Sequence, residues 1–199
     1  MQRFLGLFLF SIMFISFNAK ADLLLEPVIG YSMGLKGSVK EGTISGTGLK
    51  TTEDKFSGGS GPSFGGRVGY QKLGLQVGLD YLHSSVNPSD KEFKSNLDIN
   101  EWAAFVGFEF PILFRVYGAY IFSADGQGKY DTGTSFEKLT LKDGSGLKAG
   151  LGFTLLPFLD INLEYRRGTF GEWKAGSIKV DGDVDYSIYM IGLSLPFTI

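Results

Sequence analysis

The chain has 199 residues, with 19 Lys or Arg against 21 Asp or Glu, and this balance excludes the concentrated basic surface of a nucleic-acid-binding protein. It contains no cysteine, which excludes disulfide scaffolds, thiolate metal sites, thiol nucleophiles and an acylated N-terminal cysteine. Glycine, at 29 residues, and aromatic residues, at 15%, are both frequent, and this composition favours many strands and turns.

The first 21 residues have the features of an export signal. Arg3 supplies a positive charge, residues 4–17 form an apolar core, and Ala19-Lys20-Ala21 fits an A-x-A cleavage site. The core is short for a membrane helix, which needs about 20 apolar residues to cross the hydrocarbon layer. We therefore predict a cleaved signal peptide over residues 1–21 and one domain over residues 22–199.

The remaining sequence alternates apolar residues with small or polar residues, a period of two that predicts strands with two unlike faces. The apolar face of the first strand has Leu25, Pro27, Ile29, Tyr31, Met33 and Leu35, and the other face has Glu26, Val28, Gly30, Ser32, Gly34 and Lys36. The next three apolar faces are formed by Phe64, Val68 and Tyr70, by Leu73, Leu75, Val77, Leu79 and Tyr81, and by Trp102, Ala104, Val106, Phe108 and Phe110.

Four more strands continue the pattern towards the C-terminus. Their apolar faces have Phe114, Val116, Tyr120 and Phe122, then Leu147, Ala149, Leu151, Phe153 and Leu155, then Leu159, Ile161, Leu163 and Tyr165, and finally Tyr189, Ile191, Leu193, Leu195 and Phe197. Three large apolar residues, Phe105, Tyr117 and Ile121, interrupt the opposite faces.

Short and long connections alternate between these strands. Tight turns are expected near residues 71–72, 111–112 and 156–157, and long loops over residues 37–60, 84–96, 124–144 and 168–183. This arrangement predicts a closed eight-stranded antiparallel up-and-down transmembrane β-barrel with its termini in the periplasm. Closure is required because an open sheet edge in lipid would leave backbone groups unsatisfied at several kcal/mol each.

The non-apolar faces decide which side meets lipid, since a soluble ligand-carrying barrel would invert the two faces. They are dominated by glycine, which suits the narrow lumen of an eight-stranded barrel. The charged residues among them are expected to form paired charges in that lumen: Glu26, Asp80, Glu101, Glu109 and Glu164 as acids, and Arg67, Arg115, Lys148 and Arg166 as bases. We interpret this set as a polar plug, with a conducting pore or proton path as the alternative.

With this pattern of strands, the chain resembles the small eight-stranded outer-membrane proteins, the group that contains OmpX, OmpW and the membrane domain of OmpA. The pattern covers residues 22–199, and the most specific match is Gly192, Leu195 and Phe197, which fit the C-terminal assembly signal of that family. The resemblance implies that the barrel-assembly machinery reads this strand. The family usually ends on the aromatic residue, whereas this chain continues with Thr198 and Ile199.

Two groups of residues invite a chemical interpretation. His83 and Ser85 form a His-x-Ser that resembles part of the His-x-Ser-Asn motif of lipid A deacylases, but Val86 replaces the asparagine, so an ordinary loop histidine is expected. Asp181, Asp183 and Asp185 alternate and can share a face, which allows a Ca²⁺ site. Tyr186 occupies the position of the glycine in an EF-hand, so a solvated acidic rim is favoured.

Aromatic residues are expected at the membrane interfaces or against lipid: Trp102, Trp173, Tyr31, Tyr70, Tyr81, Phe110, Phe114, Tyr165 and Phe197. The resulting hypothesis is a monomeric, non-enzymatic barrel without cofactors in Gram-negative outer-membrane lipid, with a role in envelope integrity or surface interaction and an unknown loop partner. The alternatives are a narrow channel for ions or small solutes, a lipid A-modifying enzyme and a soluble periplasmic barrel.

Overall fold

The structure is a computed structural model that describes residues 22–44, 53–88, 96–111, 113–131, 136–156, 158–176 and 178–199. The predicted signal peptide lies outside the described residues. Every regular element in the described ranges is a β-strand. The part of the chain that the structure describes contains no helix long and apolar enough to cross a membrane.

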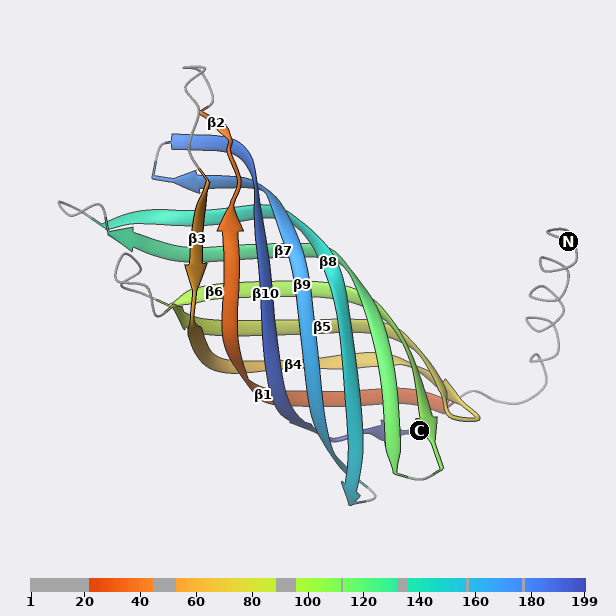
Figure 1. Cartoon of the computed structure of the whole chain (residues 1–199). Helices are drawn as coiled ribbons and strands as arrows, with labels where there is room; N and C mark the ends of the chain where they lie inside the picture. Colours follow the sequence, from red (N-terminus) through yellow and green to blue (C-terminus); the bar gives the residue numbers. More distant parts are fainter. Residues whose placement is uncertain are drawn as a thin grey trace, which may run out of the picture.

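Eight long antiparallel strands form the body of the molecule (Figure 1). They are β1 (Asp22–Val39), β4 (Gly59–Lys72), β5 (Leu75–Pro88), β6 (Leu97–Phe110), β7 (Phe114–Asp131), β8 (Phe136–Leu156), β9 (Leu159–Ala175) and β10 (Ile178–Ser194). Each pairs with the next, and β1 pairs with both β4 and β10, so the eight strands form a hydrogen-bonded ring. The predicted fold class is confirmed.

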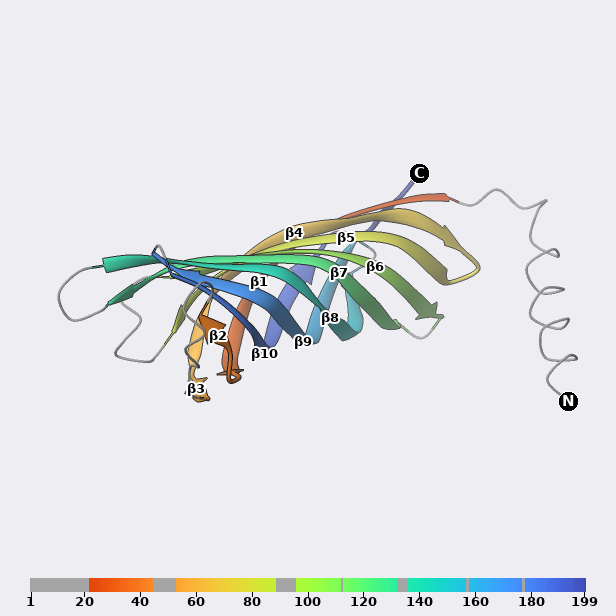
Figure 2. The same ribbon diagram turned by 90° about the horizontal axis from the view of Figure 1, so that it is seen from above.

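Three short strands complete the sheet: β2 (Thr43–Ile44) pairs with β10, β3 (Asp54–Ser57) with the end of β1, and β11 (Phe197–Thr198) with its start. The start of β1 and the C-terminus lie together at one end, where Leu23 and Ile199 exchange backbone hydrogen bonds. The opposite end carries β2, β3 and the projecting hairpin of β7 and β8 (Figures 1 and 2). We call the end with the start of β1 and the C-terminus the turn end, and the opposite end the hairpin end.

Two of the four predicted long loops are wrong, because the strands continue through them, and the other two, over residues 37–60 and 84–96, lie partly outside the described residues. β7 and β8 pair as far as Asp131 and Phe136, and β9 and β10 pair as far as Ala175 and Ile178. Only residues 132–135 and 176–177 separate these strand pairs. Two of the expected loops, over residues 124–144 and 168–183, are therefore long β-hairpins that extend the ring at the hairpin end.

The faces of the strands follow the predicted alternation over most of the ring. Apolar side chains expected outside are exposed, for example Ile29 at 63%, Phe64 at 56% and Val77 at 53%. Charged side chains on the alternate positions are buried, such as Asp80 at 3% exposure. The outer face is therefore apolar and the inner face polar, the inverse of a water-soluble protein.

Leu35 and Lys36 have the opposite orientation to the predicted one. The pairing of β1 with β10 shifts between Met33 and Lys36, where Gly34 has a φ of 67°. A bulge adds one residue to one strand and so exchanges the inward and outward positions beyond it. Leu35 is consequently fully buried, whereas Gly34 and Lys36 are exposed.

Facing glycines allow β4 and β5 to approach closely inside the barrel. Gly69 and Gly78 are direct partners, and a Cβ on Gly78 would collide with the backbone carbonyl oxygen of Val68. Gly118 on the outer face differs, because an added Cβ would lie 3.8 Å from its nearest neighbour, the Lys148 carbonyl oxygen.

Gly78→Val is therefore expected to lower the free energy of unfolding by about 1–3 kcal/mol or more, the usual cost of overpacking. Gly118→Ala, the matched control, should refold like the wild type. The refolded fraction, read from the difference in gel migration before and after heating, measures both effects. Equal refolding of the two variants would contradict the close approach of β4 and β5.

Candidate functional site

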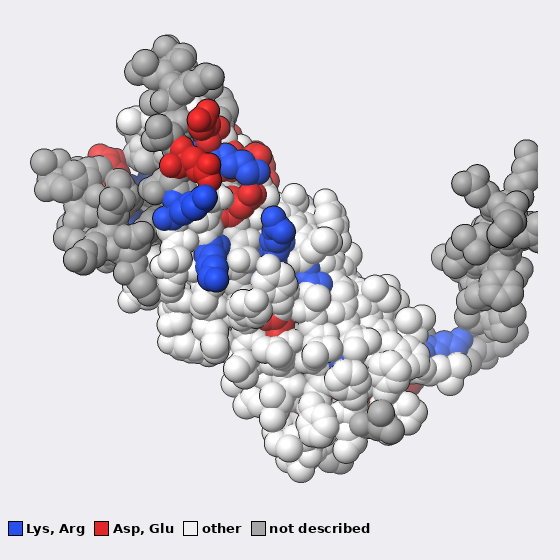
Figure 3. Space-filling view, viewed as in Figure 1, with Lys and Arg blue, Asp and Glu red and all other residues white. Residues whose placement is uncertain are grey.

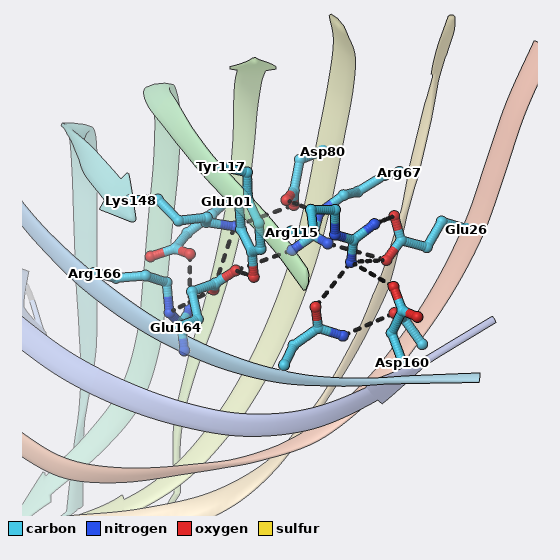
Figure 4. A network of polar contacts seen from close by, with 12 residues as sticks. Glu26, Arg67, Asp80, Glu101, Arg115, Tyr117, Lys148, Asp160, Glu164 and Arg166 are labelled. Atoms are coloured by element: carbon cyan, nitrogen blue, oxygen red, sulfur yellow. Dashed lines mark hydrogen bonds and ion pairs between the residues drawn. The ribbon is translucent and has the colours of Figure 1, made fainter. Parts of the chain in front are cut away.

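Among the described residues, nine charged residues are buried inside the ring, and none of them is more than 4% exposed. They project from seven strands towards a common centre (Figure 4). We call them the lumen network: Glu26, Arg67, Asp80, Glu101, Arg115, Lys148, Asp160, Glu164 and Arg166. Their positions follow from strand alternation, which directs every second residue inward.

Arg67 is the central residue of the lumen network, because its guanidinium contacts three carboxylates from three strands. Its Nε donates to Asp80 Oδ2 at 2.9 Å, its Nη1 to Glu26 Oε1 at 3.1 Å and its Nη2 to Glu164 Oε2 at 3.1 Å. Its Cζ lies 4.1 Å from the centre of the Tyr117 ring, within the range of a cation–π contact. The Tyr117 hydroxyl donates to Glu164 Oε2 at 3.0 Å.

Arg115 forms a two-pronged pair with Glu26 on the side of the turn end. Its Nη1 donates to Glu26 Oε2 at 2.8 Å and its Nη2 to Glu26 Oε1 at 2.6 Å. The same Nη2 donates to Asn162 Oδ1 at 2.8 Å and lies 3.4 Å from Asp160 Oδ2. This planar geometry is the strong form of an arginine–carboxylate pair.

Lys148 and Arg166 extend the lumen network towards the hairpin end. Lys148 Nζ donates to Asp80 Oδ1 at 3.1 Å, and Arg166 Nη1 donates to Glu101 Oε2 at 2.8 Å. Arg166 also donates to the hydroxyls of Ser84 and Ser32, at 3.2 and 2.7 Å. The ion pairs thus form one continuous group across the barrel, with partners far apart in sequence.

The composition of the lumen network suits a plug held together by ion pairs. It has five carboxylates and four cations, so most charges are balanced by a neighbour. Four of its buried atoms make no hydrogen bond: Arg115 Nε, Asp160 Oδ1, Glu164 Oε1 and Arg166 Nε. Buried charges are costly unless they are paired and hydrogen-bonded, and here partners from other strands supply that compensation.

The structure brings together eight of the nine charged residues that the sequence singled out. Glu109 lies apart and accepts hydrogen bonds from Gln71 Nε2 at 2.9 Å and Gln76 Nε2 at 3.3 Å near the turn end. Sequence reasoning missed the place of Asp160 in the lumen network, although it has the same parity as Glu164 and Arg166. It also missed the contacts of Tyr117 with the lumen network. The available signal was that Tyr117 occupies an inward-facing position where the other residues of the strand are mostly small or polar.

A second cluster fills the interior at the hairpin end, and it is apolar. We call it the apolar cap: Leu35, Val86, Leu97, Ile99, Ile121, Ala124, Leu139, Leu141, Phe170, Val184 and Ile188. Tyr186 joins the two clusters, because its ring stacks on Phe170 at 5.1 Å and its hydroxyl donates to Glu101 Oε1 at 2.6 Å. The predicted polar plug therefore accounts for only part of the interior.

The aromatic residues divide between the two faces. Tyr31, Tyr70, Phe110, Tyr165, Phe197 and Trp102 are exposed on the outer face, and Tyr81 and Phe114 are half-buried. Trp173 does not belong with them, because it is half-buried and packs against the apolar cap. The expectation that it is an interfacial anchor is wrong, because Trp173 pairs with Leu141 and Val180, which are both buried, and therefore lies on the inner side.

His83 lies in strand β5 rather than in a loop. Its Nδ1 is 2.8 Å from Asn100 Oδ1, an oxygen that also accepts from the Tyr81 hydroxyl at 3.0 Å. The Ser85 hydroxyl accepts from Asn96 Nδ2 at 3.1 Å. Since an amide oxygen only accepts, Nδ1 carries the proton and the histidine is held by a neutral group, whereas a catalytic triad holds it with a carboxylate.

Lys40 lies between two of the three alternating aspartates at the hairpin end. Its Nζ is 3.5 Å from Asp183 Oδ2 and 3.2 Å from Asp185 Oδ2. The side chain of Asp181 lies outside the described part of the chain. Among the described side chains, no group of three or more His, Cys, Asp or Glu is arranged to hold a metal ion.

Of the residues of the predicted assembly signal, Gly192 lies on β10, Phe197 on β11 and Leu195 between these two strands. Gly192 faces inward, where a Cβ would come within 2.9 Å of the Ile29 carbonyl oxygen. Leu195 and Phe197 are exposed on the outer face, at 37% and 48%. An apolar outward pair after a small inward residue is the pattern that the sequence predicted, and its use in assembly stays a prediction.

Comparison with solved structures finds similar barrels. Ail, the attachment invasion locus protein of Yersinia pestis, is 18% identical with a TM-score of 0.56, over 87% of this chain and 98% of that chain. Ail in complex with the heparin analogue sucrose octasulfate is 17% identical with a TM-score of 0.54, over 88% and 99%. Neisserial surface protein A is 17% identical with a TM-score of 0.49, over 90% and 100%.

No protein-family model and no curated protein sequence matches the chain. The two structures of Ail therefore show the fold, and they confirm the predicted likeness to small eight-stranded outer-membrane barrels.

Replacing Arg67 with methionine should leave Glu26, Asp80 and Glu164 without their shared cation. The expected loss in free energy of unfolding is about 3–5 kcal/mol, the usual cost of removing one partner of a buried pair. Glu109→Gln, outside the lumen network, is the control and should cost less than about 1 kcal/mol. Urea unfolding in phosphatidylcholine vesicles measures both, and equal losses would contradict the central place of Arg67.

The pKa of Asp185 is expected to be sensitive to its hydrogen-bond donors. A bond from Thr169 Oγ1 at 2.6 Å, with help from Lys40, lowers the pKa of Asp185 below its ordinary value of 3.8, and Asp185 raises the pKa of Lys40 above 10.5. The stabilisation from Asp185 is thus complete above pH 3.8 and is lost as the pH falls through its lower folded pKa.

NMR titration of the Asp185 carboxyl carbon should give a midpoint below 3.8 in the wild type and a higher midpoint in Thr169→Val. Lys40→Met should also raise the midpoint. A midpoint that stays fixed in both variants would show that these contacts do not hold the carboxylate.

Proposed function

We propose that this chain is an integral outer-membrane β-barrel of a Gram-negative bacterium, exported by a signal peptide over residues 1–21. The side chains in its lumen form a sealed structural plug, and its hairpin end faces the outside of the cell. It acts as a monomer in outer-membrane lipid, without catalysis, in envelope integrity or surface interaction. Gly192, Leu195 and Phe197 serve the barrel-assembly machinery during insertion.

The apolar outer face is the observation that supports the membrane location. Its exposed side chains come from every strand of the ring and include Ile29, Phe64, Leu79, Val106, Phe122, Leu151, Leu163 and Ile191. Soluble monomers rarely expose a contiguous apolar patch larger than a few hundred square ångströms, and a band around the whole ring exceeds that limit. In Figure 3 the charged residues gather at the hairpin end, and the rest of that face is almost uncharged. These features disfavour a soluble periplasmic barrel.

The interior supports a plug more strongly than a channel. The lumen network fills the middle of the barrel with ion pairs between carboxylates and cations that are all buried. Beyond it, an ion would have to pass the apolar cap, and hydrophobic constrictions oppose ion passage because they exclude water. Two unlike barriers in series therefore separate the turn end from the hairpin end.

The hairpin end is suited to surface interaction because it is an ordered extension of the barrel. β7, β8, β9 and β10 continue beyond the lumen network, and the apolar cap packs between them. The described ends of these hairpins are thus carried on a packed support. Surface interaction through the hairpin end is accordingly the role we favour.

The contacts of His83 favour a non-catalytic role. An imidazole held by Asn100 lacks the carboxylate that stabilises the charged form of a general base. His83 also packs against Phe64, with ring centres 4.7 Å apart, on a face rich in exposed apolar side chains. We assign it to the outer membrane interface.

Cell fractionation should recover the protein with the outer membrane, in a form that migrates differently on gels before and after boiling. Recovery in the aqueous fraction without detergent would overturn the proposal. In planar bilayers the purified barrel should show no stepwise conductance across applied voltages. Discrete openings that change in Arg67→Ala would instead establish the narrow channel.

A further inference from the structure

One hydrogen-bonded row of the sheet changes from apolar to basic as it crosses the outer face. Direct partners link Ala104 to Tyr120, Leu147, Arg167, Ser187 and Lys36 in turn across six strands. Strands in such barrels tilt by about 35–45°, so a row perpendicular to them also climbs through the membrane. The residue types indicate that its Ala104 end lies in the apolar band and its Lys36 end lies above it.

Arg167 and Lys36 are placed to hold one anion between them. Both side chains are exposed, and only Ser187 stands between them in the row. Neighbouring strands are about 4.8 Å apart, so their backbones are about 10 Å apart, within reach of two long side chains that converge. The bulge at Gly34 is what turns Lys36 outward to complete this arrangement.

A shallow depression surrounds these two residues, with a volume of about 430 Å³. Lys55 on β3 also lines it, and its Nζ is 3.3 Å from Glu53 Oε1. Asp185 is the carboxylate in its lining, and this group is engaged by Thr169 and Lys40. We call this the basic depression; Figure 3 shows Lys and Arg gathered on this part of the outer face.

An apolar groove adjoins the basic depression and shares Tyr165 and Arg167 with it. Its volume is about 1100 Å³, and small outward residues on three neighbouring strands, Ala104, Gly118 and Ala149, line it. Larger side chains, Val106, Tyr120 and Leu147, stand around them. The groove thus has the volume to hold an acyl chain, and Arg167 lies at its border with the basic depression.

We propose that the basic depression and the groove together bind one phosphorylated lipid of the outer leaflet. The phosphate lies between Arg167 and Lys36, with Lys55 nearby, and one acyl chain lies over Gly118 and Ala149. Charge complementarity selects the phosphate, and the adjoining apolar groove selects a lipid over a soluble anion. The inference rests on the proposed membrane location of the barrel.

The test compares phosphatidic acid with diacylglycerol of the same chains, which lacks the phosphate. Native mass spectrometry of the refolded full barrel, released from detergent micelles, measures how much of each lipid is retained. The wild type should retain phosphatidic acid in preference, and millimolar inorganic phosphate should not displace it. Displacement by phosphate alone, or equal retention of both lipids, would overturn the proposal.

Two double variants separate the contributions of the head group and the chain. Lys36→Gln with Arg167→Gln should weaken phosphatidic acid binding about 25-fold, because each basic residue near an anionic surface contributes about a factor of five. Gly118→Leu with Ala149→Leu should weaken binding of both lipids by filling the groove. An added Cβ at Gly118 meets nothing closer than 3.8 Å, so a side chain has room where it leaves the backbone at this position.

Lys138→Gln with Lys142→Gln is the matched control, because it removes the same charge from exposed positions on β8 outside the basic depression. It should bind like the wild type; weakening equal to that of the Lys36 and Arg167 variant would reduce the effect to general charge. Heat-dependent gel migration checks the fold of each variant. A folded, detergent-dependent barrel that does not discriminate the two lipids refutes this inference alone, whereas a water-soluble protein refutes the membrane location.

Discussion

An eight-stranded ring is too narrow to hydrate a charge in its interior, so each buried charge depends on partners from other strands. Arg67 meets this constraint by contacting Glu26, Asp80 and Glu164, which belong to three different strands. The pairs hold opposite walls of the barrel in one register, since a shift of one residue would turn every charge towards lipid. The paired charges therefore stabilise the register of the strands around the whole ring.

The interior of the barrel has a polar region in the middle and an apolar region at the hairpin end. In the middle, strands that are apolar outside place glycines, hydroxyls and charges inside. At the hairpin end, where the surroundings become aqueous, the inner face is apolar, as in the core of a soluble protein. Tyr186 joins these regions through its contacts with Phe170 and Glu101. The inner face thus changes from polar to apolar at the level where the outer face ceases to be apolar.

The sequence predicted the strands and their faces well because a period of two is a local property that lipid on one side enforces. The partners within the lumen network were not predictable, because Glu26 and Arg115 meet across the barrel from positions 89 residues apart. The orientation of Leu35 was not predictable, because the sequence does not distinguish the glycine at a bulge, Gly34, from the many glycines that lie where there is no room for a side chain. The hairpins over residues 124–144 and 168–183 resemble loops in sequence, because their polar residues are also typical of solvated loops.

The pairing of the two ends of the chain has a consequence for biogenesis. Leu23 and Ile199 exchange hydrogen bonds, and β1 receives both β11 and β10. The seam of the cylinder therefore joins the first residues described to the last, and it cannot form before the chain has been synthesised as far as β11. Until both segments are present, two edges of the sheet stay unpaired, and unpaired strand edges are templates for pairing with other chains.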